Sequence, residues 1–110
     1  MILRIDGTDV PVIWEKNESV QALEALCPLT IEMSMYGGFE QVGSIRSSLP
    51  RSDRQTSTAP GDLVLYSGDQ LVVFYGTNRW AYTRLGRVDL TKEELAALLS
   101  EHDVTIHWRR

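Results

Sequence analysis

Three residues on one short stretch have side chains that could form a binding surface. Trp80, Tyr82 and Arg84 alternate with smaller residues, so a β-strand would present all three on one face. Aromatic rings beside a guanidinium group can hold a small molecule or a peptide. Such rings more often fill a core. We expect a groove if the residues between them point toward the interior.

Arginines are concentrated in an earlier segment. Arg46, Arg51 and Arg54 lie close together in a chain whose formal net charge is -4. Guanidinium groups match carboxylates and phosphates, so one interpretation is an anion site. The other, which we favour, is a solvated loop in which Asp53 and neighbouring acids neutralise the arginines.

The sequence carries no specific motif for catalysis or metal binding. It has no phosphate-binding loop, no dinucleotide fingerprint and no serine with convincing His and Asp partners. His102 and His107 lack supporting cysteines or clustered carboxylates, which makes a zinc site a poor interpretation. Glu40 and Asp62 are candidate carboxylate partners, but two acids among 15 indicate no site. We expect no catalytic residue, no metal and no cofactor.

Length and composition restrict the class of protein. A chain of 110 residues with 43% hydrophobic residues suits one domain over residues 1–110. The sequence pI of about 5.1 argues against nucleic acid or a membrane as a partner. The first residues, MILRIDG, read as a strand and not as a signal peptide, and Cys27 has no second cysteine to pair with. We therefore expect a cytoplasmic location.

Two segments have the spacing and end signals of helices. The first follows a cap at Asn17 or Ser19 and ends before Pro28. In the second, Thr91 and Glu94 form a capping box. Cys27, at the end of the first helix, is interpreted as a buried structural thiol because that end of a helix disfavours a thiolate.

The other apolar segments predict eight strands. They are Ile2–Ile5, Val10–Glu15, Leu29–Tyr36, Phe39–Ile45, Asp62–Tyr66, Gln70–Tyr75, Trp80–Val88 and Val104–Trp108. Tight turns at Asp6–Gly7 and Ser67–Asp69 join two of the pairs. The fifth and sixth strands are apolar on both faces, which predicts deep burial. The third should bury Met35 on its apolar face, and Arg46–Asp62 should be a long loop.

The order of these elements resembles that of the cyclophilins. GDLVLY resembles the cyclophilin strand that begins with glycine, and LVVFY resembles the strand that forms one wall of the proline pocket. LGRV resembles the Phe-Gly-Lys-Val part of a late cyclophilin strand. The whole chain is more similar to small, mostly uncharacterised cyclophilin-like proteins of bacteria and archaea than to true cyclophilins.

The sequence departs from the cyclophilins where their catalytic residues lie. The strand Phe-His-Arg-Val, which carries the catalytic arginine, has its nearest counterpart in Phe39-Glu40-Gln41-Val42, and the histidine of the late strand is replaced by Tyr82. An isomerase would need a donor for the proline amide nitrogen, which Arg46 or Arg84 would have to supply. The resemblance implies that half of an apolar pocket is retained without its catalytic half.

Together these patterns predict a mainly β domain, a closed or nearly closed eight-stranded cyclophilin-like barrel with two capping helices. We expect it to bind a small molecule or a short peptide in an aromatic and arginine-lined groove, under the Arg46–Pro60 loop, without chemistry of its own. The candidate ligand-binding residues are Tyr36, Phe39, Arg46, Tyr75, Trp80, Tyr82 and Arg84. A divergent peptidyl-prolyl isomerase and a homo-oligomeric module that pairs the strand at Pro11 are the alternatives. The oligomeric state is left open.

Overall fold

The chain folds into two helices and eleven strands, which the computed structural model describes over residues 1–110. The strands are β1 (Ile2–Ile5), β2 (Thr8–Val10), β3 (Val12–Trp14), β4 (Leu29–Glu32), β5 (Ser34–Tyr36), β6 (Glu40–Ser44), β7 (Arg54–Ser57), β8 (Asp62–Tyr66), β9 (Gln70–Phe74), β10 (Arg79–Val88) and β11 (Thr105–Arg109). The helices are α1 (Glu18–Leu26) and α2 (Lys92–Leu99), and neither is long and apolar enough to cross a membrane. The predicted mainly β fold with two helices is confirmed.

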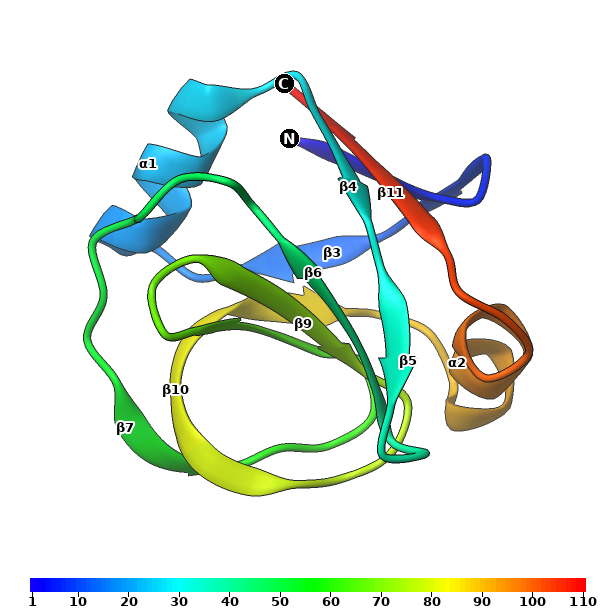
Figure 1. Ribbon diagram of the computed structural model, residues 1–110. Helices are drawn as coiled ribbons and strands as arrows, with labels where there is room; N and C mark the ends of the chain where they lie inside the picture. Colours follow the sequence, from blue (N-terminus) through cyan, green and yellow to red (C-terminus); the bar gives the residue numbers. More distant parts are fainter.

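The strands form two antiparallel sheets. The smaller has the order β2-β1-β11-β4, and the larger has the order β3-β10-β8-β9-β6-β5, with β7 pairing on β10. The first and last strands pair directly, so the two termini lie near each other (Figure 1). The helices lie on opposite sides of the molecule in the same view.

At two points the chain passes from the smaller sheet to the larger one through a single residue. Pro11 separates β2 from β3, and Met33 separates β4 from β5. Proline has no N–H to donate to a ladder, and the Met33 N–H bonds to the carbonyl of Val104, beyond the end of β4. The predicted second and third strands are therefore each divided. The hydrogen bonds define two sheets, and no closed barrel of eight strands is found.

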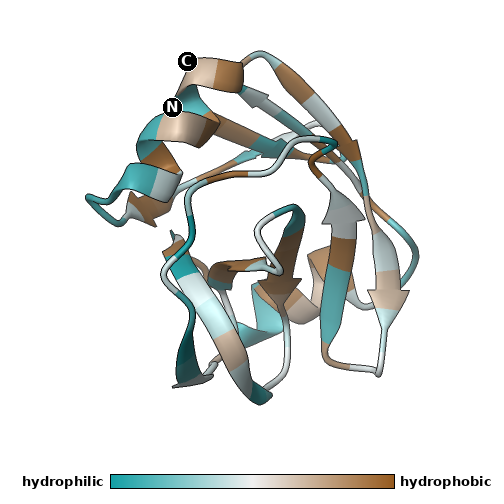
Figure 2. Ribbon diagram, turned by 60° about the vertical axis from the view of Figure 1, so that its left-hand side comes forward, coloured by the Kyte–Doolittle hydropathy of each residue, from teal (hydrophilic) through white to brown (hydrophobic).

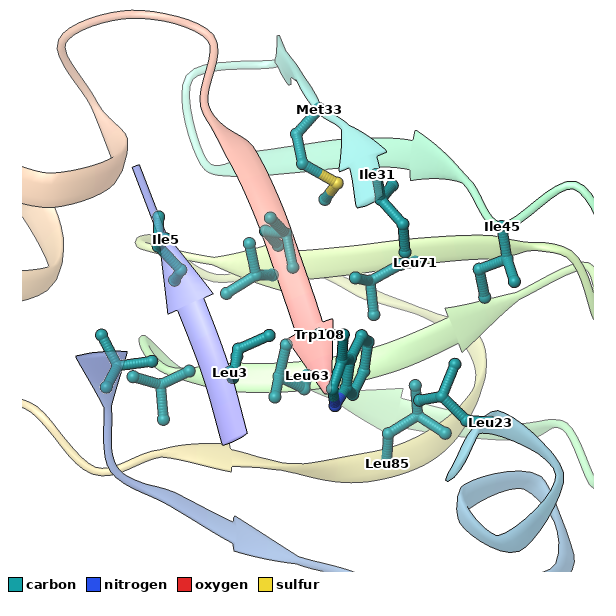
Figure 3. Close-up of a cluster of buried hydrophobic side chains, with 14 of the residues drawn as sticks. Leu3, Ile5, Leu23, Ile31, Met33, Ile45, Leu63, Leu71, Leu85 and Trp108 are labelled. Atoms are coloured by element: carbon teal, nitrogen blue, oxygen red, sulfur yellow. The ribbon is translucent and has the colours of Figure 1, made fainter. Parts of the chain in front are cut away.

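The main core lies between the two sheets. Figure 3 shows Leu63, Leu71 and Leu85 of the larger sheet gathered near Trp108 and Leu3 of the smaller one. Trp108 is 1% exposed and stacks on Trp14 with 5.2 Å between ring centroids. Both helices contribute leucines to this core, which fixes them against the sheets.

A second apolar cluster lies on the opposite face of the larger sheet. It consists of Val64, Val72, Phe74 and Tyr82. Side chains alternate along a strand, so β8 and β9 send one set of residues to the main core and the other set to this second cluster. The strongly hydrophobic parts of the ribbon in Figure 2 lie mostly on strands. The deep burial predicted for β8 and β9 is confirmed. These strands are apolar on both faces because each face packs into a different apolar cluster.

Local signals fixed the turns and helix ends as predicted. Asp6 and Gly7 have φ values of 46° and 81°, the left-handed pair that a tight hairpin needs. The α1 cap is Asn17, whose side chain accepts from the Val20 N–H at 2.9 Å. Both hydrogen bonds of the capping box between Thr91 and Glu94 are present at the start of α2.

Three predictions about single segments were wrong in part. The polar segment 46–62 contains β7, whose backbone pairs with β10 although its sequence, RQTS, has no apolar alternation. Met35 is 38% exposed because the switch of sheets at Met33 interrupts the alternation expected across the predicted third strand. Cys27 is half-buried, and burial raises the pKa of its thiol.

Candidate functional site

A cavity of about 440 Å³ opens on the face of the larger sheet that carries the second apolar cluster. We call it the aromatic pocket. It is lined by Tyr36, Glu40, Val42, Tyr66, Val72, Asn78, Trp80 and Tyr82. Its volume is in the range of small-molecule sites, and its lining is mostly apolar with a few polar groups, as in such sites.

The register of the larger sheet places these residues together. Val42 of β6 pairs with Val72 of β9, which in turn pairs with Val64 of β8. Beside this row of valines, Glu40 of β6 pairs with Tyr36 of β5. The strand order puts β10 and β5 on opposite sides of this row, yet both line the same cavity, so the sheet curls around it.

The rim of the pocket consists of exposed aromatic rings. Tyr36 is 63% exposed, Trp80 is 55% exposed and Tyr66 is 38% exposed. Side chains whose purpose is to fill a core would not remain this accessible, and exposed apolar groups gathered at one place indicate an interaction site. The alternative that the rings of the 80–84 segment only fill a core therefore fails for Trp80.

The floor of the pocket is more rigid than its rim. Tyr82 is 4% exposed, and its hydroxyl accepts a hydrogen bond of 2.9 Å from the side-chain amide of Asn78. Its ring contacts those of Phe74 and Tyr66 edge-on, with centroids 5.7 Å and 6.1 Å away. Burial raises the pKa of the Tyr82 hydroxyl, so this residue stays neutral at physiological pH.

Glu40 is the one acidic residue of the lining. The residue is 6% exposed, and burial raises the pKa of its carboxyl group to about 7. No hydrogen bond and no charge from another residue contributes to this shift. The carboxyl group therefore has both protonation states available near neutral pH and keeps its hydrogen-bonding capacity free.

A second, polar cavity of about 570 Å³ lies next to the aromatic pocket, and Tyr82 borders both. It is lined by Glu15, Asn17, Ser52, Arg54, Gln55, Thr56, Ser57, Tyr82, Thr83 and Arg84. Within it, Arg84 is paired with Asp62 at 3.2 Å, and the Asp62 side chain is 5% exposed. Arg84 neutralises a buried acid, which leaves less of its charge for a ligand.

The structure divides the seven candidate residues between several places. Tyr36, Trp80 and Tyr82 line the aromatic pocket, whereas Arg84 lines the polar cavity. Phe39 lies behind the lining, edge-on to Tyr36 and stacked on Phe74.

Two candidates lie in neither cavity, so the structure does not gather the seven residues into one groove. Tyr75 packs against the main core, where its hydroxyl is buried without a partner. Arg46 is exposed, with a φ of 65°, and lines neither the aromatic pocket nor the polar cavity. The loop 46–60 contributes to the polar cavity and not to the aromatic pocket, so it does not cover the rings as expected. Arg51 is paired with Asp53, as the solvated-loop interpretation predicts.

Sequence reasoning did not place Glu40, Tyr66 or Asn78 in the site. For Glu40 the sequence does contain a signal: Glu40 and Val42 are two residues apart, so a strand puts the acid on the same face as an apolar side chain. Sequence alone does not place Tyr66 and Asn78 at the pocket, because their positions there depend on which strands become neighbours.

The segment Phe39-Glu40-Gln41-Val42 leads into β6 and is the nearest counterpart of the cyclophilin strand that carries the catalytic arginine. Gln41 is fully buried and points away from the pocket. Its amide donates to the carbonyls of Leu99 and His102 at 2.8 Å and 2.7 Å, and its oxygen accepts from the Val104 N–H. The strand thus supplies no cationic donor to the site. The sequence profile of the cyclophilin-like family matches residues 3–109 of the chain.

The chain belongs to the cyclophilin-like family. The match covers nearly the whole chain, so the resemblance expected from GDLVLY, LVVFY and LGRV is confirmed. No curated protein matches the chain. Family membership supports the fold, and the function has to be argued from the site itself.

Proposed function

We propose that this cyclophilin-like protein binds a small ligand, or one side chain of a short peptide, in the aromatic pocket without chemistry of its own. The observation that carries the proposal is the rim of three exposed rings around a formed cavity with an apolar floor. A ligand that enters the cavity would remove part of this exposed apolar surface from water, which favours binding. A reducing, cytoplasmic location is part of the proposal because Cys27 has no disulfide partner in the chain.

The test is an NMR titration that follows the indole N–H of Trp80. The probes are fragment-sized neutral, cationic and anionic compounds together with a blocked Ala-Pro dipeptide. We expect at least one probe to shift the Trp80 resonance and raise the melting temperature, because binding to the native state alone stabilises it.

Two variants with matched exposure distinguish the pocket from the rest of the surface. Trp80→Ala removes a rim ring that is 55% exposed, whereas Ile13→Ala removes an apolar side chain that is 53% exposed on β3, outside the pocket. The first should abolish the stabilisation and the second should retain it. A panel in which no probe shifts Trp80 would refute the proposal.

The alternatives from the sequence have less support. No arginine lines the aromatic pocket, so an isomerase would lack the guanidinium donor that a cyclophilin places on the amide nitrogen. We therefore do not propose isomerase activity. Pairing of the strand at Pro11 in a homo-oligomer stays a prediction, and the dependence of molecular size on concentration is its test.

A further inference from the structure

The aromatic pocket has a definite electrostatic character. Glu40 is the one carboxylic acid of its lining, which contains no lysine, arginine or histidine. Arg54 and Arg84 lie on the other side of Tyr82, in the polar cavity, and Arg84 is paired with Asp62. A ligand in the aromatic pocket therefore meets negative charge alone.

The carboxylate of Glu40 has no partner in the protein. The residue is 6% exposed, and neither a hydrogen bond nor a positive charge from another residue stabilises its ionised form. Buried acids are ordinarily paired or hydrogen-bonded because an unpaired buried charge is costly. The register of β6 nevertheless holds this acid beside Tyr36 and on the same face as Val42. A positively charged ligand would supply the missing partner.

The rings around Glu40 suit the same kind of ligand. An aromatic face carries negative potential and attracts a cation placed over it, most strongly for tryptophan. Trp80 on β10 and Tyr36 on β5 approach the cavity from opposite sides, with the valines of β6 and β9 between them. Walls of this kind favour a cation with alkyl groups, because the methyl groups contact the apolar floor while the charge faces the rings and the acid.

We propose that the ligand of the aromatic pocket is an organic ammonium ion, held between the carboxylate of Glu40 and the rings of Trp80 and Tyr36. The inference rests on the proposed function and deepens it by naming the ligand class. A neutral ligand would leave the acid unpaired, and an anion would be repelled by it. The rings and the acid together form an aromatic cage with its own counter-ion.

The proposal predicts that binding depends on pH. A cation pairs with the ionised form of Glu40, and the pKa of that carboxyl group is about 7 in the free protein. The other titratable groups of the lining are Tyr36, Tyr66 and Tyr82, and burial raises the pKa of the Tyr82 hydroxyl, which keeps that group protonated over this pH range. The ionised fraction of Glu40 falls roughly thirty-fold from pH 8 to pH 5.5, and the affinity for a cation should fall by about the same factor.

The experiment compares choline with 3,3-dimethyl-1-butanol, which has the same shape and no charge. Calorimetry at pH 8 measures both affinities for the full chain, and the Trp80 indole resonance reports where each compound binds. We expect choline to bind at least tenfold more tightly than the alcohol. At pH 7, choline binding should release protons, which measurements in two buffers with different ionisation enthalpies will detect.

Variants assign the effect to residues. Glu40→Gln should remove both the preference for choline and its pH dependence, whereas Glu32→Gln, at an exposed acid on β4, should retain them. Trp80→Ala, at a rim position 55% exposed, should weaken choline binding without loss of the fold, so the proposal stays testable if Glu40→Gln fails to fold.

The outcomes separate this inference from the proposed function. Equal affinity for the two compounds, or tighter binding of the alcohol, would overturn the ammonium assignment and leave a neutral-ligand pocket in place. Choline binding that is insensitive to both pH and Glu40→Gln would equally overturn the role of Glu40. If neither compound binds, the ammonium assignment is wrong, and the wider panel of probes decides the proposed function.

Discussion

Glu40 and Gln41 are neighbours on β6 whose side chains serve opposite faces of the larger sheet. Glu40 faces the aromatic pocket, while Gln41 is fully buried and bonds to the carbonyls of Leu99 and His102. The alternation of a strand therefore separates a site residue from a structural residue by a single position. Substitutions at the two positions should have distinct consequences, one for binding and pH dependence and the other for stability.

Replacing Gln41 by leucine should destabilise the fold without changing the aromatic pocket. The substitution removes three hydrogen bonds and leaves buried backbone groups at the end of α2 and before β11 without partners. Each such group costs about 1–3 kcal/mol, so we expect a loss of about 3 kcal/mol or more in the free energy of unfolding by urea. Gln21→Ala, at an exposed position on α1, should change stability by less than about 0.5 kcal/mol. Equal stabilities of the two variants would contradict the structural role of Gln41.

Glu40→Gln should change how stability depends on pH. The carboxyl pKa is raised from 4.5 to about 7, so between these pH values the folded protein binds more protons than the unfolded chain. This group therefore makes the wild type less stable as pH rises from 4.5 to 7, by up to about 3 kcal/mol. The Glu40→Gln variant lacks this loss, so its free energy of unfolding should equal that of the wild type near pH 4 and exceed it at pH 8. Urea unfolding curves at both pH values measure the difference, and parallel pH profiles would contradict the raised pKa.

Breaking the pair between Arg84 and Asp62 should destabilise the protein moderately. Arg84→Met leaves the buried Asp62 carboxylate with the Ala59 N–H, at 2.9 Å, as its hydrogen-bond donor. The arginine side chain is 42% exposed, so water screens part of the interaction and we expect a loss of about 1–2 kcal/mol.

A double-mutant cycle that adds Asp62→Asn measures the interaction free energy between the two side chains. Because Arg84 lies outside the aromatic pocket, Arg84→Met should leave the shift of the Trp80 indole by bound probes intact. Loss of probe binding in that variant would show that the two cavities act as one site.

The protein should not accelerate isomerisation of a blocked Ala-Pro dipeptide. The aromatic pocket has an apolar floor for a proline ring but no guanidinium group to donate to the amide nitrogen. Uncatalysed exchange takes tens to hundreds of seconds, so NMR exchange spectroscopy would detect even weak catalysis. Faster exchange that is lost in Trp80→Ala would restore the isomerase alternative.

Much of the fold could be predicted from short stretches of sequence. The Asp6–Gly7 turn and the capping box at Thr91 formed as predicted, and the cap of α1 is Asn17, one of the two residues predicted for it, because each feature depends on groups a few residues apart. The double-sided apolar pattern of β8 and β9 likewise predicted their burial. The segments GDLVLY, LVVFY and LGRV also predicted the family, which the match over residues 3–109 confirms.

The candidate site was predicted less completely. Trp80 and Tyr82 were correctly placed on one face of a strand, but nothing local separates them from Arg84, which enters the polar cavity. The residue types of Arg46 and Tyr75 suit a ligand site, but Tyr75 packs against the main core and Arg46 lies in neither cavity.

The sequence by itself determined the two helices, most of the strand segments, the helix caps and the tight turns, and which strands are apolar on both faces, because neighbouring residues decide these properties. Only the tertiary structure decided that β7 pairs with β10, that the chain changes sheet at Met33, and that the larger sheet curls to bring β5 and β10 to one cavity. Those features depend on pairing between strands far apart in the chain. The free carboxylate of Glu40 belongs with them, because its burial and its lack of a partner result from what surrounds it in space.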